Sequence, residues 1–400
     1  MTSLKLILCA GAGAFALGLA GAAAAQTAPA PAAPAAPQPT PMPYPAMTAP
    51  LAANGSPATF DAGPLGKIMV DGVLSADALW QSNPQFGPFG QTHDGYADIT
   101  NAQVIVNKTD GPIQFYIQAG AYSIPALGAT YLTTSQLDSN TYGYVPQGFV
   151  KIVPNSTFNV MIGALPTLIG DEYTFSFENM NIERGLLWGQ EPAVSKGVQG
   201  NFSQGPLAIS LAWTDGYYSN TYSALSGLIT YTFKNSDTLT FAGEGNVSTN
   251  HVNTFVTPIQ QNNGQIYNII FSHSQGPWTI SPYLQWSSSP HITSGGVTLS
   301  QSGQTWGAAV LTKYNFTPAF SVAGRIEYIS STGKANLLGY GINSNAWSFT
   351  ITPTYQKGIF FVRGEVSYVT IGSGTPGFMF GPNGTATDQA RGMIETGFIF

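Results

Sequence analysis

The chain ends on the stretch Arg391-Gly392-Met393-Ile394-Glu395-Thr396-Gly397-Phe398-Ile399-Phe400. Successive side chains of a β-strand point to opposite faces, so a strand over this stretch has two different faces. One face carries Ile394, Phe398 and Phe400, and the other carries Arg391 and Glu395. An aromatic face backed by a charged one suits a strand that has lipid on one side and a polar lumen on the other.

The same stretch bears on where the protein is found. A final strand that ends on an aromatic residue resembles the signal that the assembly machinery of bacterial outer-membrane barrels reads. We therefore expect Phe398 and Phe400 to be an assembly signal and the barrel assembly machinery to be a partner. The expected location is the bacterial outer membrane, with its lipid around the barrel.

The N-terminus has the pattern of an exported protein. Lys5 precedes an apolar stretch over residues 6–20, and Ala23, Ala24 and Ala25 offer a small-residue cleavage site. We expect residues 1–25 to be a signal peptide rather than an uncleaved membrane helix, because the segment is mostly Ala and Gly and ends in a cleavage pattern. Cys9 is the only cysteine, so the mature chain is expected to lack disulfide and thiolate-metal chemistry.

The composition narrows the class of protein. Loss of Lys5 reduces the 13 Lys and Arg residues to 12, against 19 Asp and Glu, and this negative balance argues against nucleic acid as a partner. Hydrophobic residues make up 43% of the chain, yet no uncharged apolar run after residue 25 is long enough for a transmembrane helix. A membrane-spanning chain of this kind must satisfy its backbone groups in a closed barrel.

Residues 26–59 differ from the rest of the chain. Repeated Ala-Pro units favour an extended polyproline conformation and offer little surface to bury. We expect a disordered periplasmic linker here, with contact to the cell wall or to a partner as the alternative.

Alternating residues from Lys67 onward predict β-strands. In residues 206–215, for example, Leu207, Ile209, Leu211 and Trp213 share one face, and small or polar residues share the other. A soluble β-sandwich shows the same alternation. The two ends of the chain favour a barrel over residues 60–400.

Short polar turns alternate with long connections along this region. Seven short turns and eight long loops join sixteen strands in an all-β, transmembrane antiparallel β-barrel, and a barrel of that size leaves an aqueous channel. The turns are expected at 108–111, 154–155, 204–206, 234–236, 275–277, 315–318 and 357–358. The loops are expected at 81–97, 122–146, 164–193, 215–221, 249–264, 288–302, 331–343 and 371–388.

The third long loop combines acidic and apolar residues. So many apolar side chains would be unusual on a fully exposed loop, and we expect the loop to fold back into the barrel, with apolar groups on the wall and carboxylates narrowing the pore. A surface loop with solvated acids is the alternative. The residues expected at the constriction are Asp171, Glu172, Glu178, Glu183 and Arg184.

A family resemblance begins in this loop and the strand after it. The residues that carry it are Gly163, Thr167, Gly170, Glu172, Asn181, Arg184, Pro192, Gly197 and Val198. Their pattern resembles the OmpL-like outer-membrane β-barrel porins. The resemblance implies a porin-type barrel, lends no catalytic residues and leaves the solute open.

The free-energy cost of exposing a charge to lipid indicates which way the charged residues on three of the last strands point. An Arg that faces lipid at mid-bilayer costs about 2 to 4 kcal/mol, so these side chains are expected on the lumen wall. If these residues lie opposite an acidic loop, they would set up a transverse electric field that orients polar solutes. Alternatively, each Arg is neutralised by a nearby Glu, and the pairs support the wall. The residues are Arg325, Glu327, Arg363, Glu365, Arg391 and Glu395.

Together these features predict a porin through which small hydrophilic solutes diffuse passively, with a mild preference for cations and no cofactor. A homotrimer is compatible with the sequence, which shows no interface. An adhesin or structural barrel without transport is the first alternative, and an outer-membrane hydrolase is the second. His93, His251, His273 and His291 occur singly, with no metal-binding spacing and no nucleophile elbow.

Overall fold

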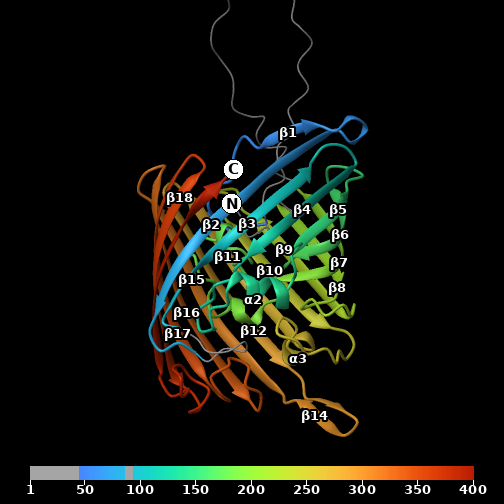
Figure 1. Cartoon of the computed structure of the whole chain (residues 1–400). Helices are drawn as coiled ribbons and strands as arrows, with labels where there is room; N and C mark the ends of the chain where they lie inside the picture. Colours follow the sequence, from blue (N-terminus) through green and yellow to red (C-terminus); the bar gives the residue numbers. More distant parts are fainter. Residues whose placement is uncertain (1–44, 86–92) are drawn as a thin grey trace, which may run out of the picture.

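The computed structural model describes residues 45–85 and 93–400, and this part of the chain forms a closed antiparallel β-barrel (Figure 1). Sixteen strands make the barrel, as predicted, and each pairs with its neighbours in the chain. The strands are β2 (Lys67–Gln81), β3 (Gly95–Lys108), β4 (Ile113–Tyr122), β5 (Gln147–Ile152), β6 (Phe158–Pro166), β7 (Val194–Gln204), β8 (Leu207–Thr214), β9 (Ala224–Thr232), β10 (Thr238–Asn246), β11 (Gln265–Gln275), β12 (Trp278–Ser289), β15 (Gly303–Asn315), β16 (Phe320–Gly333), β17 (Asn345–Lys357), β18 (Phe360–Ser373) and β19 (Asp388–Ile399).

The last strand closes the barrel on the first. β19 pairs antiparallel with β2, from Arg391 opposite Gln81 to Ile399 opposite Val73. Beyond this ladder, the Gly72 amide donates to the Phe400 carbonyl at 2.7 Å and the Phe400 amide donates to the Gly72 carbonyl at 2.9 Å. No sheet edge therefore remains between the first and last strands, which is the condition for a barrel in hydrocarbon.

Short turns and long loops lie at opposite rims, as the alternation predicted. The short turns and both chain ends of the barrel lie at the top of Figure 1. The long loops contain elements that the sequence did not reveal: helix α2 (Thr134–Asn140), helix α3 (Ile259–Asn262) and a hairpin of β13 (Ile292–Ser294) and β14 (Val297–Ser300). These elements are too short to produce a clear periodic pattern.

The outward face of the wall is apolar. On β8, Leu211 is 66% exposed, and on β19 Ile394 is 59% exposed, while Arg391 and Glu395 beside it are buried inside. Exposed aromatic side chains gather near both ends of the strands, where membrane proteins carry aromatic belts. Those nearer the long loops include Trp80, Trp213, Tyr267, Trp286, Trp306, Trp347 and Tyr368, and those nearer the short turns include Tyr231, Phe233, Trp278, Phe316, Phe320, Phe360, Phe398 and Phe400.

The expectation of a disordered linker up to residue 59 does not hold for its last part. Residues 45–52 have defined contacts inside the barrel, and strand β1 (Ala58–Asp61) pairs antiparallel with β2 through residues 67–70, past the point where β19 ends. A one-turn helix, η1 (Gly63–Leu65), connects the two strands. The physical reason is that this part of the linker contains apolar residues that can be buried, notably Met47 and Leu51. The expected signal peptide and residues 26–44 lie outside the described residues.

Within the described ranges, no helix has the length and apolar character needed to cross a membrane.

A charge on the outward face should destabilise the barrel. Leu211 lies in the middle of β8, and we expect Leu211→Arg to lower the free energy of unfolding by about 2 to 4 kcal/mol because the guanidinium would enter the hydrocarbon layer. The measurement is urea unfolding in lipid vesicles, with Leu211→Met as the matched control. Equal stability of the two variants would contradict the assignment of this face to lipid.

Candidate functional site: the loop between β6 and β7

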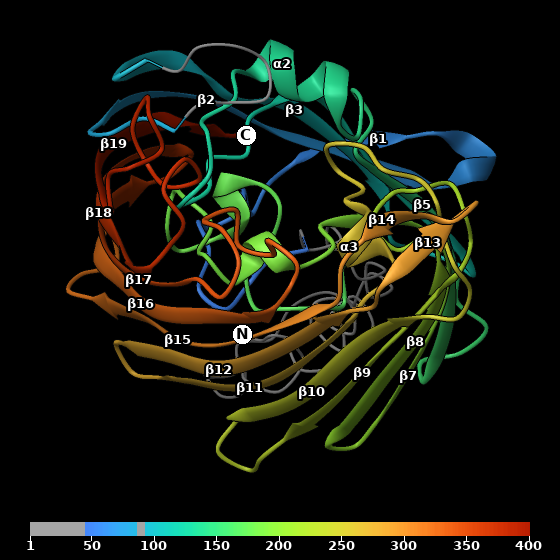
Figure 2. The same ribbon diagram turned by 90° about the horizontal axis from the view of Figure 1, so that it is seen from below.

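The connection between β6 and β7 lies inside the ring of strands, where Figure 2 shows it near the centre in green. It covers residues 167–193 and contains two short turns of 3-10 helix, η2 (Ser176–Glu178) and η3 (Trp188–Gln190). Residues 165–187 are buried without a break. A loop with this burial must find partners for its polar groups inside the barrel.

Apolar side chains attach one part of the loop to the wall. Phe175 and Phe177 stack on each other with ring centroids 6.1 Å apart, and Phe175 meets Tyr122 of β4 edge-on at 5.1 Å. Both phenylalanines and Ile169 share a buried cluster with inward-facing residues of the wall, including Tyr116 and Met161. This packing explains why the loop carries so many apolar residues.

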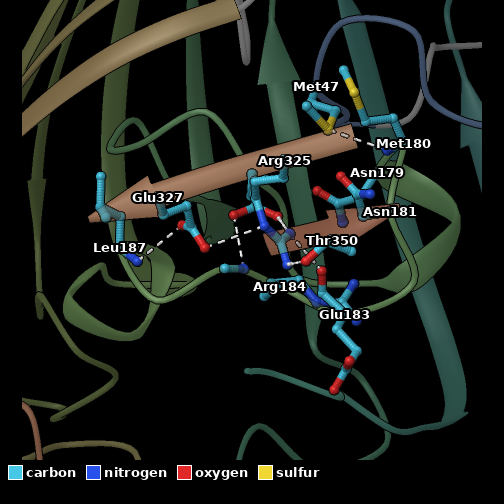
Figure 3. A network of polar contacts seen from close by, with 12 residues as sticks. Met47, Asn179, Met180, Asn181, Glu183, Arg184, Leu187, Arg325, Glu327 and Thr350 are labelled. Atoms are coloured by element: carbon cyan, nitrogen blue, oxygen red, sulfur yellow. Dashed lines mark hydrogen bonds and ion pairs between the residues drawn. The ribbon is translucent and has the colours of Figure 1, made fainter. Parts of the chain in front are cut away.

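Arg325 of β16 is the centre of a polar network that holds the other part of the loop (Figure 3). Its guanidinium donates to Glu172 Oε1 at 2.6 Å and to the carbonyl of Glu183 at 2.7 Å, and its Nε lies 3.2 Å from Glu327 Oε2. Hydrogen bonds between charged partners are the strongest in proteins, and none of the three side chains is exposed. Arg325 thus joins two points of the loop to one strand.

Glu327 of β16 binds the backbone of the loop. It accepts hydrogen bonds from the amides of Leu186 at 3.0 Å and Leu187 at 3.3 Å, and from the Ser348 hydroxyl at 2.6 Å. A Cβ on Gly185 would lie 2.1 Å from Glu327 Oε1, so only glycine permits this approach.

A second pair joins β18 to β19. Arg363 binds Glu395, with its Nε 3.0 Å from Glu395 Oε2, and also donates to the carbonyl of Asn179 in the loop at 3.1 Å. The other oxygen of Glu395 accepts from the Ser176 hydroxyl at 2.7 Å. The pair therefore holds the turn that η2 forms.

Glu365 of β18 receives the next part of the loop. It accepts hydrogen bonds from the amides of Ile182 at 2.6 Å and Glu183 at 2.9 Å, and from the Thr352 hydroxyl at 2.6 Å. Carboxylates on the wall thus satisfy backbone N–H groups that would otherwise be buried without partners.

Arg391 of β19 connects two loops. It donates to Glu183 Oε1 at 2.7 Å and to the carbonyl of Ala126, in the loop between β4 and β5, also at 2.7 Å. Ser367 donates to the second oxygen of Glu183 at 2.7 Å.

Arg184 has a different set of partners from the other arginines. Its guanidinium donates to the carbonyls of Pro125 and Ile182, and its backbone forms a parallel bridge with Ala126. Arg184 therefore fastens the loop between β4 and β5 to the loop between β6 and β7. The sequence contained no sign of this contact, because the two loops are separated by two strands.

The remaining expected constriction residues lie further along the loop. Asp171 accepts a hydrogen bond from the Ser281 hydroxyl of β12, and Glu178 accepts one from the Phe175 amide at 3.0 Å within its own turn. Asn179 supports that turn through its side chain, which accepts from the Tyr173 amide at 2.8 Å and donates to the Tyr173 carbonyl at 2.9 Å. Asn179 was not among the expected site residues, although Asn is a typical residue of tight turns.

One part of the expected arrangement needs correction. We expected the carboxylates of Asp171, Glu172, Glu178 and Glu183 to narrow the pore, but none of these side chains is exposed, and each accepts a hydrogen bond from a protein group. An exposed row of acids opposite free arginines, as a transverse field requires, is therefore not what this geometry provides. Burial favours pairing because an unpaired charge out of water is costly.

Nothing in the described ranges forms a group of three or more His, Asp or Glu residues that could hold a metal ion. His273 lies 2.8 Å from Asp237, through Nδ1 and Oδ1.

The family of the chain follows from a comparison of its sequence with known families. The family model described as "Putative beta-barrel porin-2, OmpL-like" matches residues 67–400, from the start of β2 to the last residue. The chain belongs to this OmpL-like porin family. The sequence resemblance is thereby confirmed. Membership of this family also supports a function as a diffusion channel and a location in the bacterial outer membrane.

Solved porin structures share the fold of this OmpL-like porin. The outer-membrane channel DcaP of Acinetobacter baumannii aligns with a TM-score of 0.57 at 12% identity and covers 86% of this chain and 100% of its own. OmpF of Salmonella typhi, in complex with daunomycin, aligns with a TM-score of 0.56 at 13% identity, again over 86% and 100%. OmpT of Vibrio cholerae aligns with a TM-score of 0.56 at 12% identity, over 84% and 98%. No curated protein matches the chain.

Loss of one partner of the Arg363–Glu395 pair should loosen the loop. We expect Arg363→Met to cost about 3 to 5 kcal/mol of unfolding free energy, because Glu395 would keep a buried charge without its cation. The double variant Arg363→Met, Glu395→Met removes both charges and should recover most of the loss. Urea unfolding in lipid vesicles compares the two, and a double variant as unstable as the single one would refute the pairing.

Proposed function

We propose that this porin is a passive channel for small hydrophilic solutes, and that the loop 167–193 forms its narrowest section. The observation that carries the proposal is the attachment of this loop to β16, β18 and β19 by Arg325, Arg363 and Arg391. A loop held across part of the lumen limits the size of a solute while leaving the rest of the cross-section to water.

The wall at β3, β4, β6 and β7 is also polar. It carries uncharged amides that bind one another, for example Gln118 to Gln103 at 2.7 Å between β4 and β3, and Asn201 to Asn159 at 2.8 Å between β7 and β6. Amide side chains offer both donors and acceptors, so these four, which are at most 3% exposed, can satisfy one another inside the wall. These amides therefore make this part of the wall polar and hold its strands together.

The charge balance of the interior supports a mild preference for cations. Arg184, Arg325, Arg363 and Arg391 are outnumbered by the five carboxylates of Glu172, Glu183, Glu327, Glu365 and Glu395, and Asp171 and Glu178 add to the excess. Because most of these charges are paired, the remaining field is weak, and so is the expected selectivity.

The proposal assigns no reaction and no cofactor to the chain. It also includes two partners besides lipid and solute: the barrel assembly machinery and further copies of the same chain. Phe398 and Phe400, which are both 45% exposed on the outward face, are proposed as the assembly signal. A homotrimer is proposed as the assembly, and one of the similar structures is a trimer form of OmpT of Vibrio cholerae, aligned with a TM-score of 0.55 at 10% identity.

Vesicle swelling tests the channel directly. Liposomes that contain the refolded chain should swell in neutral sugars, amino acids and organic acids, with a rate that falls as solute size increases. Liposomes with unfolded chain are the control. Failure of folded barrels to admit any of these solutes or to conduct ions would reject transport, and ligand binding without conduction would favour an adhesin; release of fatty acid from phospholipid would indicate a hydrolase.

Ion selectivity is a separate prediction. In a planar bilayer with a KCl gradient, we expect a small reversal potential of the sign that favours K⁺, because the interior carries more carboxylates than guanidinium groups. A reversal potential of the opposite sign would contradict the proposed cation preference without affecting the swelling result.

A further inference from the structure

Residues 45–52 run through the interior of the barrel and lie against the loop 167–193. The Met47 amide donates to the carbonyl of Glu178 at 3.1 Å, and the Leu51 amide donates to the carbonyl of Phe177 at 3.3 Å. Met180 donates its amide to Met47 Sδ at 3.2 Å, a contact visible in Figure 3. The side chains of Met47 and Leu51 are only 1% and 4% exposed, so the segment is packed against the loop and the wall.

The same segment reaches three strands of the wall. Thr48 Oγ1 lies 3.3 Å from Ser272 Oγ of β11. Ala52 exchanges two hydrogen bonds with the Gln356 side chain of β17, both of 2.8 Å. Ser272 and Gln356 lie near the ends of their strands that lead into short turns, so the segment lies on that side of the loop.

The third strand contributes a cation. Lys313 of β15 donates its ammonium to the carbonyls of Ala49 at 3.0 Å and Pro50 at 3.3 Å. Two carbonyl oxygens of the segment therefore bind a charge that otherwise faces the interior. The segment itself has no charged side chain, so it covers Lys313 without neutralising it.

The composition of the segment suits this position. Pro45 and Pro50 have no N–H group, which reduces the number of backbone donors that need partners inside the barrel. A segment attached both to the loop and to β11, β15 and β17 also occupies part of the cross-section through which solutes would pass.

We propose that residues 45–52 form a second constriction of the pore, on the short-turn side of the loop 167–193, which restricts conductance and covers the cationic site at Lys313. This inference rests on the proposed channel function. It assigns a permeation role to part of the chain that lies outside the barrel strands.

Two truncations test the constriction. Both are refolded from chains that begin after residue 25: one lacks residues 26–44 and keeps the segment, and the other lacks residues 26–52. We expect the first to conduct like the chain that begins at residue 26. The second should have a higher unit conductance, and its reversal potential in a KCl gradient should shift toward Cl⁻ because Lys313 becomes open to the lumen.

Lys313→Gln separates the two effects. In the chain that lacks residues 26–52, this substitution should abolish the shift toward Cl⁻ while the higher conductance remains. Equal unit conductance of the two truncated chains would overturn the proposal. So would a full increase in unit conductance on loss of residues 26–44 alone. Absence of conductance in the untruncated chain would instead reject the channel function itself.

A disulfide keeps the proposal testable if the longer truncation does not fold. The hydroxyls of Thr48 and Ser272 are close enough for a disulfide between Thr48→Cys and Ser272→Cys, and a chain that begins at residue 26 lacks Cys9. We expect oxidation to cross-link this pair and to leave the low conductance unchanged. The control pair is Thr48→Cys with Ser210→Cys, because Ser210 faces inward on β8, three strands away from β11, and should not cross-link. A folded Thr48→Cys, Ser272→Cys barrel that does not cross-link, or whose conductance changes on oxidation, would overturn the placement of the segment.

Discussion

The structure depends on the need to pair every backbone N–H and C=O group in a medium without water. A chain that crosses hydrocarbon by strands can meet this need only when the first and last strands pair, and here β2 and β19 do so up to the terminal Phe400. Because the barrel is closed, each strand has lipid on one side and the interior on the other, and this requires apolar and polar residues to alternate along it. Closure also determines the even number of strands, since the chain returns to the rim where β2 begins.

The interior of the barrel meets the same requirement by other means. A loop that enters the lumen takes its backbone groups and its charges away from bulk water, and the wall must supply partners for both. Glu327 and Glu365 accept loop amides, while Arg325, Arg363 and Arg391 bind loop carbonyls or carboxylates. Charged residues in the barrel are thus used mainly to hold a segment in place.

Sequence reasoning found the features that repeat locally. The strand count, the turns and the resemblance to OmpL-like porins all followed from alternation, turn residues and the residue pattern of the third long loop and the strand after it. It did not find α2, α3 or the β13–β14 hairpin, because a few residues of helix or strand within a long loop leave no period to read. It also treated Met47 and Leu51 as part of an open linker, since the surrounding Ala-Pro repeats dominate the local composition.

The pattern along the chain decided the class of fold and the side of each strand on which the charges lie, because the alternation of a strand is a property of neighbouring residues. It placed acids in the third loop and arginines on the last strands, yet it contained no information on which acid meets which arginine. Glu172 and Arg325 are 153 residues apart, and Arg391 and Glu183 are 208 apart. Only the closed barrel brings these groups together, and burial in its interior then selects paired over solvated charges, because a charge removed from water needs a partner of opposite sign.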